Sequence, residues 1–293
     1  MMRVPGAYAT AVRDPEGVVH VDRKLFQSVT ERSRLWGKPI FRGMASLFEA
    51  MRMGLATLQW SADIAMPEEG KQNKIAEFFS TIFAIGLAIT LFMIAPMWIT
   101  TKFMNIEKEA LWFNLVSGAF RIMFFVVYLL VISLMKDVRR LFQYHGAEHR
   151  VVYNFESGND INVENAQSFP TQHPRCGTSF LFIILLSAIL VFAFVDTVLM
   201  YFLGTISLPI RFLFHLPMIP FVSGIGYELI KSSAKIDSLL YSLLKKPGLW
   251  LQNITTKQPE DNMVEVSITA LKEAFGNRYE NMAGKEYTAE AIG

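Results

Sequence analysis

The chain has 293 residues, of which 52% are hydrophobic and 18% are charged, and its mean hydropathy is +0.30. The charged fraction is below the quarter or so that is typical of a soluble domain, and a net charge of only +2 argues against a nucleic-acid-binding protein. The single cysteine, Cys176, excludes an intrachain disulfide.

The first 74 residues are predicted to form a cytoplasmic N-terminal segment. Residues 7–12 and 18–21 flank the turn sequence Asp14-Pro15-Glu16-Gly17 and predict a small β-hairpin. Residues 39–60 carry apolar side chains at helical spacing and three charges. This pattern predicts an amphipathic helix that lies at the membrane interface or packs against a helical bundle.

Four apolar stretches follow, each long enough to cross the hydrocarbon core as a helix. They cover residues 75–99, 110–135, 178–202 and 205–230. The sequence therefore predicts an all-α integral membrane protein with about four transmembrane helices, paired within 75–135 and 178–230. Residues 136–177 are predicted to be a cytoplasmic loop that contains histidines and the cysteine. Residues 231–293 are predicted to be a cytoplasmic C-terminal segment.

Within the C-terminal segment, the run Lys245-Lys246-Pro247-Gly248 is predicted to end one helix, because proline and glycine commonly mark helix ends. Residues 263–275 place apolar side chains at helical spacing and predict an amphipathic helix. The residues from Gly276 onward are expected to be frayed.

Lysine and arginine are distributed unevenly along the chain. Eleven lie in residues 1–74, five in 136–177 and eight after residue 230, whereas the connection 100–109 holds two and the short connection between the last two apolar stretches holds none. Positive residues concentrate on the cytoplasmic side of membrane proteins. Both termini are therefore predicted to be cytoplasmic, in a multi-pass protein of the inner (plasma) membrane.

Two pairs of metal-ligating residues lie in the predicted loop. If the helix predicted over residues 110–135 continues past the membrane interface, His145 and His149 share one face of it, with Glu148 beside them. Two histidines at this spacing can bind one zinc ion, and the order His-x-x-Glu-His makes the glutamate a candidate general base. His173 and Cys176 form a second pair, and Glu164 lies between the two pairs.

The loop is thus predicted to bind a divalent metal, zinc, through a set of ligands drawn from His145, His149, His173, Cys176 and Glu164. Four protein ligands would make a closed, structural site, whereas three with a water would leave an open, catalytic position. Both alternatives stay open. So does a third interpretation, in which these side chains only hydrogen-bond one another or lipid headgroups.

Charged residues inside the apolar stretches are expected to face the bundle, since an unpaired charge in lipid is costly. Arg121 therefore needs a partner. Asp196 and Arg211 are expected to form a structural ion pair, and His215 is expected to be hydrogen-bonded. Glu228 is expected to reach water or to support the metal ligands.

The motif residues resemble a known family. Tyr-His-Gly-Ala-Glu-His at 144–149, Val-Glu-Asn at 163–165 and His-Pro-Arg-Cys-Gly-Thr-Ser-Phe at 173–180 are similar to the YqhQ-like bacterial membrane proteins. This family of unknown function is generally described as predicted metal-dependent enzymes. The resemblance implies four membrane helices and a metal role but no substrate, and it extends over nearly the whole chain through residues 42–43, 226–228 and 247–252.

Met1-Met2-Arg3 is similar to the end of the glycine-rich segment that opens the family's sequences. The resemblance therefore implies that this chain starts where that segment has already ended. Either the start codon lies further upstream, or this member lacks the segment.

Three functional hypotheses follow from the sequence. The first is a metal-dependent enzyme, a hydrolase, at the cytoplasmic membrane face, with Glu148 as the catalytic base. The second is a scaffold or assembly factor with a structural metal site. The third is a transporter, which with only four spans would have to be a homo-oligomer. All three have the lipid bilayer as partner, and none has an identified substrate.

Overall fold

A computed structural model describes residues 1–66, 74–233 and 239–287 of the chain. The strands are β1 (Met2–Val4), β2 (Ala7–Arg13) and β3 (Val19–Leu25). The longer helices are α2 (Phe41–Ala65), α3 (Lys74–Ile89), α4 (Ala95–Met104), α5 (Ala110–Ser133), α6 (Lys136–Glu156), α8 (Gly177–Leu203), α9 (Leu208–Ser233), α10 (Leu239–Thr255) and α11 (Asp261–Phe275). Short helical segments are α1 (Val29–Arg32), η1 (Thr90–Ile94), α7 (Val163–Gln167), η2 (Gly276–Arg278) and α12 (Tyr279–Met282).

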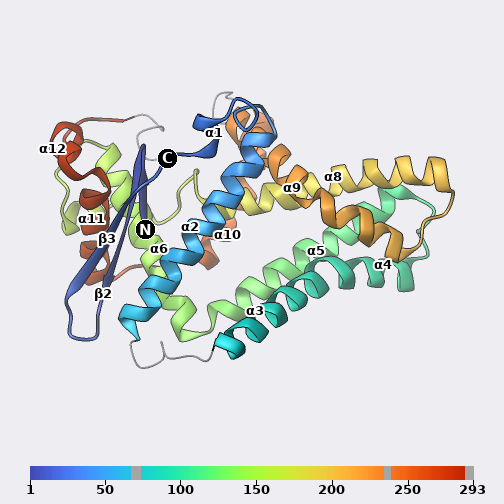
Figure 1. The fold of residues 1–293 in the computed structure, drawn as a ribbon, viewed down its shortest axis with the longest axis horizontal. Helices are drawn as coiled ribbons and strands as arrows, with labels where there is room; N and C mark the ends of the chain where they lie inside the picture. The colour runs from blue at the N-terminus through green and yellow to red at the C-terminus, as the bar shows by residue number, and fades with distance from the viewer. Residues whose placement is uncertain (67–73, 234–238, 288–293) are drawn as a thin grey trace.

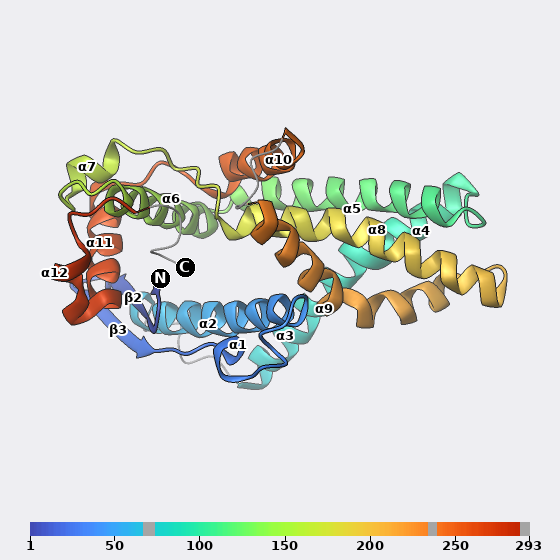
Figure 2. The same cartoon turned by 90° about the horizontal axis from the view of Figure 1, so that it is seen from above.

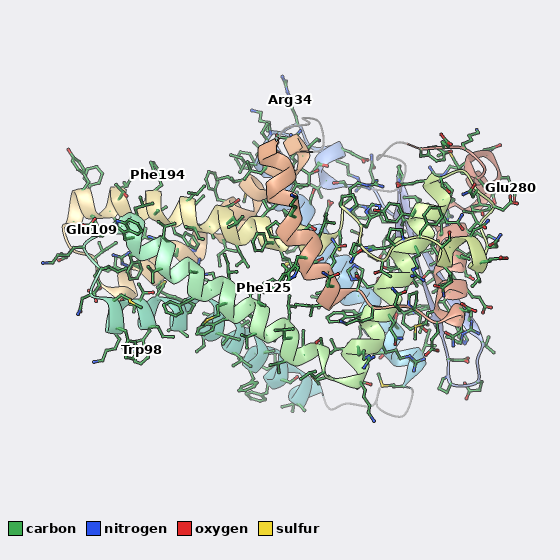
Figure 3. All side chains as sticks on the ribbon, turned by 180° about the vertical axis from the view of Figure 1, so that it is seen from behind. Arg34, Trp98, Glu109, Phe125, Phe194 and Glu280 are labelled. Atoms are coloured by element: carbon green, nitrogen blue, oxygen red, sulfur yellow. The ribbon has the colours of Figure 1, made fainter. Side chains whose placement is uncertain are left out.

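The described residues contain four helices that are long and apolar enough to cross a membrane. They cover Phe78–Met104, Ala110–Ser133, Gly177–Leu203 and Leu208–Ser232, so the predicted number and order of apolar helices are confirmed. α8 packs against both α5 and α9, and the bundle forms one end of the elongated molecule (Figure 1). Large apolar side chains such as Trp98 and Phe194 point outward from it (Figure 3), which suits a lipid environment.

The other end of the molecule is a lobe built from three segments that are far apart in the sequence. β1 and β3 both pair antiparallel with β2, so the predicted hairpin is confirmed and gains a third strand. The sheet packs on α11, which also packs on α6 and α7 (Figure 2). The shared core includes Val4, Ala7, Val151, Phe155, Val264 and Leu271. The N-terminal, central and C-terminal segments therefore form one structural unit.

α2 connects the lobe to the bundle. The helix that was predicted over residues 39–60 is therefore confirmed. Near its start, Gly43 lies so close to α9 that a Cβ atom would be 2.8 Å from the Cα atom of Gly224. Arg42 forms an ion pair with Glu228, so Glu228 holds α2 against α9. Away from these contacts, α2 exposes a stripe of apolar side chains at Phe48, Met51, Leu55 and Leu58.

Charged side chains inside the bundle have partners. The predicted ion pair between Asp196 and Arg211 is confirmed, and His215 lies 2.9 Å from the same carboxylate. Arg121 is buried and donates from Nε to the backbone carbonyl of Phe92 at 2.8 Å. That carbonyl is available because Pro96, four residues later, has no N–H to donate to it.

The segment between the second and third apolar helices, residues 136–177, contains two helices, because α6 and α7 bury one face in the lobe. Two predictions about the C-terminal segment were wrong. α10 runs through Pro247 and Gly248 instead of ending there, and the missing side chain of Gly248 lets α10 pack on Ser179 of α8. Residues 276–282 form η2 and α12 rather than a frayed end.

Candidate metal centre

α6 carries the two histidines of the predicted zinc motif. α5 ends at Ser133, and α6 begins after a turn at Leu134 and Met135, so the second apolar helix does not itself continue into the motif. α6 is unbroken through Gly146. As the spacing predicts, the rings of His145 and His149 lie together, with centroids 4.5 Å apart.

Gly146 has a packing role that helix propensity does not indicate. The segment that follows α10 crosses α6 at this residue, where the backbone N–H of Lys257 donates to the carbonyl of Phe142 at 2.9 Å. A Cβ atom on Gly146 would lie 2.1 Å from the carbonyl oxygen of Lys257. The glycine therefore permits the crossing that brings the end of α10 to the histidines.

Cys176 lies at the N-cap of α8, with its Sγ 3.5 Å from the backbone nitrogen of Thr178. The same sulfur is 3.3 Å from Nε2 of His145. Cys176 is buried, and the N-terminal end of a helix favours its thiolate form. The start of a long apolar helix thus positions the cysteine against α6.

Backbone carbonyls orient both imidazole rings. Nδ1 of His145 lies 2.9 Å from the carbonyl oxygen of Thr255, and Nδ1 of His149 lies 2.5 Å from that of Thr171. A carbonyl only accepts, so each Nδ1 carries a proton, and Nε2 of the neutral ring is the nitrogen that can bind a metal. This is the usual arrangement around metal-binding histidines.

The three side chains fit one zinc ion. Ligand atoms of His145, His149 and Cys176 all lie within 4.8 Å of one another. Tetrahedral zinc with the usual bond lengths needs a nitrogen–sulfur separation of about 3.6 Å. Since Cys176 Sγ and His145 Nε2 are already 3.3 Å apart, small side-chain movements would complete the geometry.

Without a metal, the site holds a thiolate beside an imidazolium. Burial by itself would raise the pKa of Cys176, but hydrogen bonds and charge from His145 and His149 lower that pKa to about 5. Burial by itself would lower the pKa of His145, but Cys176, Glu148 and the Thr255 carbonyl raise it to about 9. Metal binding at neutral pH would therefore displace the extra proton of His145.

His173 lies beside the three clustered residues but is not one of them. Its ring centroid is 5.6 Å from that of His149, and its Nε2 is 3.9 Å from a carboxylate oxygen of Glu156. Gln252 accepts from the backbone N–H of His173 at 2.7 Å and donates to its carbonyl at 2.9 Å. The His173 backbone is thus held by α10, and its ring is directed toward Glu156.

The two predicted glutamates lie apart from the three clustered side chains. Glu164 is exposed on α7, and Glu148 forms an ion pair with the amino group of Met1. Glu148 is still near enough to contribute to the raised pKa of His145. The carbonyls of Thr171 and Thr255, and the amide of Gln252, are site groups that the sequence motifs did not indicate. Backbone carbonyls have no signature in a sequence.

Replacing Gln252 with leucine is expected to destabilise the protein by about 2–5 kcal/mol, since buried partners lose their hydrogen bonds. These partners are the N–H and carbonyl of His173 and the hydroxyl of Ser179. Thermal unfolding in detergent measures the loss. As a control, Asn253→Leu alters the adjacent but exposed position. Equal unfolding temperatures for the two variants would contradict the bridging role of Gln252.

Comparisons with known proteins agree with the resemblance seen in the motifs. A family model described as "Protein of unknown function (DUF1385)" matches residues 38–277. The chain is 29% identical over 282 residues to a protein of Bacillus subtilis (strain 168) described as "Uncharacterized protein YqhQ", covering 91% of this chain and 86% of that protein. No solved structure matches the chain.

Proposed function

Since the chain belongs to the DUF1385 family of unknown function, we propose from its geometry that it is a membrane protein with one zinc site, formed by His145, His149 and Cys176. The proposal rests on one observation. A nitrogen of each histidine and the cysteine sulfur lie close together, and a backbone carbonyl orients each ring through its Nδ1.

The number of protein ligands favours a catalytic site over a structural one. Structural zinc sites are closed by four protein ligands, whereas catalytic sites have three and keep an open position. Here His173, the natural fourth ligand, is directed toward Glu156 instead. Zinc held by these three residues would supply a Lewis acid and would lower the pKa of a water molecule to about 7. We therefore assign the protein to the metal-dependent hydrolases.

Glu148 is the proposed proton acceptor. It lies one turn of α6 from His145 and is partly exposed, and its charge acts on that histidine. Glu148 is not a ligand, and Glu148→Gln should leave the zinc content unchanged.

A second candidate function is covalent chemistry at Cys176. The observation that favours it is the pairing of Cys176 with His145, whose ring is oriented in turn by the Thr255 carbonyl. In cysteine-dependent enzymes the nucleophilic cysteine likewise contacts a histidine base, and a third group orients that base. The two candidates differ in whether the sulfur is bound to a metal in the working protein.

Alkylation with iodoacetamide separates the two candidates. If Cys176 binds zinc, the protein as purified is expected to react at least ten times more slowly than after zinc removal by a chelator, and added zinc restores the protection. Mass spectrometry of the full chain measures the reaction, because Cys176 is the only cysteine. Rapid alkylation that a chelator does not change would favour the nucleophile.

The apolar helices and the distribution of basic residues support a plasma-membrane location with both termini in the cytoplasm. The exposed apolar stripe of α2 supports an interfacial position for that helix. Green fluorescent protein and alkaline phosphatase fused to the C-terminus test the orientation. The cytoplasmic assignment requires fluorescence without phosphatase activity.

A further inference from the structure

His173 has the sequence spacing of a zinc ligand without being one of the clustered residues. Zinc ligands commonly come in pairs separated by two to four residues, and two residues separate His173 from Cys176. The backbone N–H of Cys176 also donates to the His173 carbonyl at 3.2 Å, so the two residues close one turn. The His173 ring is only 5% exposed and borders the ring of His149. What holds this ring therefore decides whether the metal has a free fourth position.

Both nitrogens of the His173 ring face groups other than the clustered residues. Nδ1 accepts from the backbone N–H of Arg175 at 3.3 Å. Nε2 lies 3.9 Å from Oε2 of Glu156 and 3.4 Å from Nη2 of Arg175. The ring of Tyr153 packs against the His173 ring, with centroids 4.5 Å apart. Neither nitrogen can bind the metal unless the ring leaves these contacts.

Glu156 supplies the negative charge among these contacts. It is the last residue of α6, where the helix dipole disfavours a carboxylate, but the guanidinium of Arg175 pairs with its Oε1. Burial by itself would raise the pKa of Glu156, but His173 and Arg175 lower that pKa below its ordinary value. The carboxylate is therefore ionised at neutral pH, and Arg175 fixes it beside the His173 ring.

We propose that Glu156 is a positioning residue that keeps the fourth position of the zinc site open by holding the His173 ring. When the negative charge of Glu156 is absent, the ring turns and one of its nitrogens becomes the fourth protein ligand. Four protein ligands make a closed, structural site. This inference rests on the proposed zinc site, because it concerns what keeps that site catalytic.

Cobalt replaces zinc in the test, since a thiolate-bound Co²⁺ ion has visible absorption that reports its ligands. The cobalt-loaded full chain, in a neutral detergent, is titrated with sodium azide, a small anion that binds metals at an open position. Azide is expected to change the wild-type spectrum. In Glu156→Gln, the azide concentration that gives half of the change is expected to rise about tenfold, which corresponds to a His173 ring that fills the position in about nine chains of ten.

Two further variants separate this role from a general loss of structure. Glu156→Gln/His173→Ala is expected to regain the wild-type response to azide, because it has no side chain that can fill the fourth position. Damage to the end of α6 would not be repaired by this second substitution. Glu265→Gln is the matched control, since it removes another carboxylate of the lobe that pairs with an arginine, Arg13, and it should leave the azide response unchanged.

The outcomes distinguish the role of Glu156 from the zinc site. A wild-type chain that takes up no cobalt contradicts the metal site, and this inference falls with it. A wild-type chain that binds cobalt but does not respond to azide contradicts the open position and thus the catalytic assignment as well. If wild type and Glu156→Gln respond to azide equally, the role of Glu156 is overturned and the zinc site stands. A double variant that keeps the weakened response overturns it too.

Discussion

The Cys176→Ser variant, purified from zinc-supplemented cells, is expected to retain less than a tenth of the roughly one zinc per chain that the wild type should hold. The sulfur is one of only three ligand atoms in the cluster, and a neutral hydroxyl is a poor replacement for a thiolate. Serine is a good N-cap, so the start of α8 should remain folded. Elemental analysis of the gel-filtered protein gives the ratio.

Two further variants make the zinc result specific. His20→Ala removes an exposed histidine that pairs with Asp14, and it should keep full occupancy. His173→Ala should also keep most of its zinc, because the His173 ring is directed toward Glu156. Loss of zinc from His173→Ala to the level of Cys176→Ser would instead make the site a closed, structural one. Wild-type protein without metal would refute the proposal altogether.

Gly146→Ala is expected to lower the unfolding temperature by about 5–10 °C, which corresponds to overpacking of about 2–3 kcal/mol. The new methyl group would meet the carbonyl oxygen of Lys257 at 2.1 Å, and a backbone group cannot turn away as a side chain can. The displaced segment begins two residues after Thr255, whose carbonyl orients His145. Zinc affinity should therefore fall together with stability.

Gly54→Ala provides the matched control for this prediction. Gly54 lies in the middle of α2, and nothing stands within 4 Å of a Cβ added there. In open helical space alanine is favoured over glycine by up to about 1 kcal/mol, so this variant should be slightly more stable than the wild type. If the two alanine variants unfold at the same temperature, the crossing at Gly146 is not close-packed.

The parts of the fold that could be predicted are those with long, regular patterns. Twenty or more apolar residues in a row have few alternatives to a spanning helix, so the four apolar helices were found. The histidine pair was found because its spacing alone puts both rings on one face of α6. A turn sequence between two short strand-like stretches likewise indicated the hairpin, although β1 is too short to be recognised in this way.

Features that depend on contacts between distant segments could not be predicted. Pro247 and Gly248 were predicted to end a helix, yet Gly248, like Gly146, gives room to a backbone that arrives from another part of the chain. Arg121 had no visible partner, because its acceptor is a carbonyl left free by Pro96. Glu164 was included as a ligand because of its position between the two pairs, but α7 turns it to the solvent.

The lobe that joins β1 and β2 to α11 has a consequence for biosynthesis. The strands are made early, yet their buried face is covered by Val264, Leu271 and their neighbours, which are made about 260 residues later. At a translation rate of about 5–20 residues per second, the buried face of the sheet stays uncovered for roughly 13–50 seconds before α11 can pack on it. The Thr255 carbonyl, which orients His145, is made only shortly before α11, so the metal site can form only after residue 255 has been made. Chains that stop early would be recognisable to quality control by an uncovered sheet and an empty site.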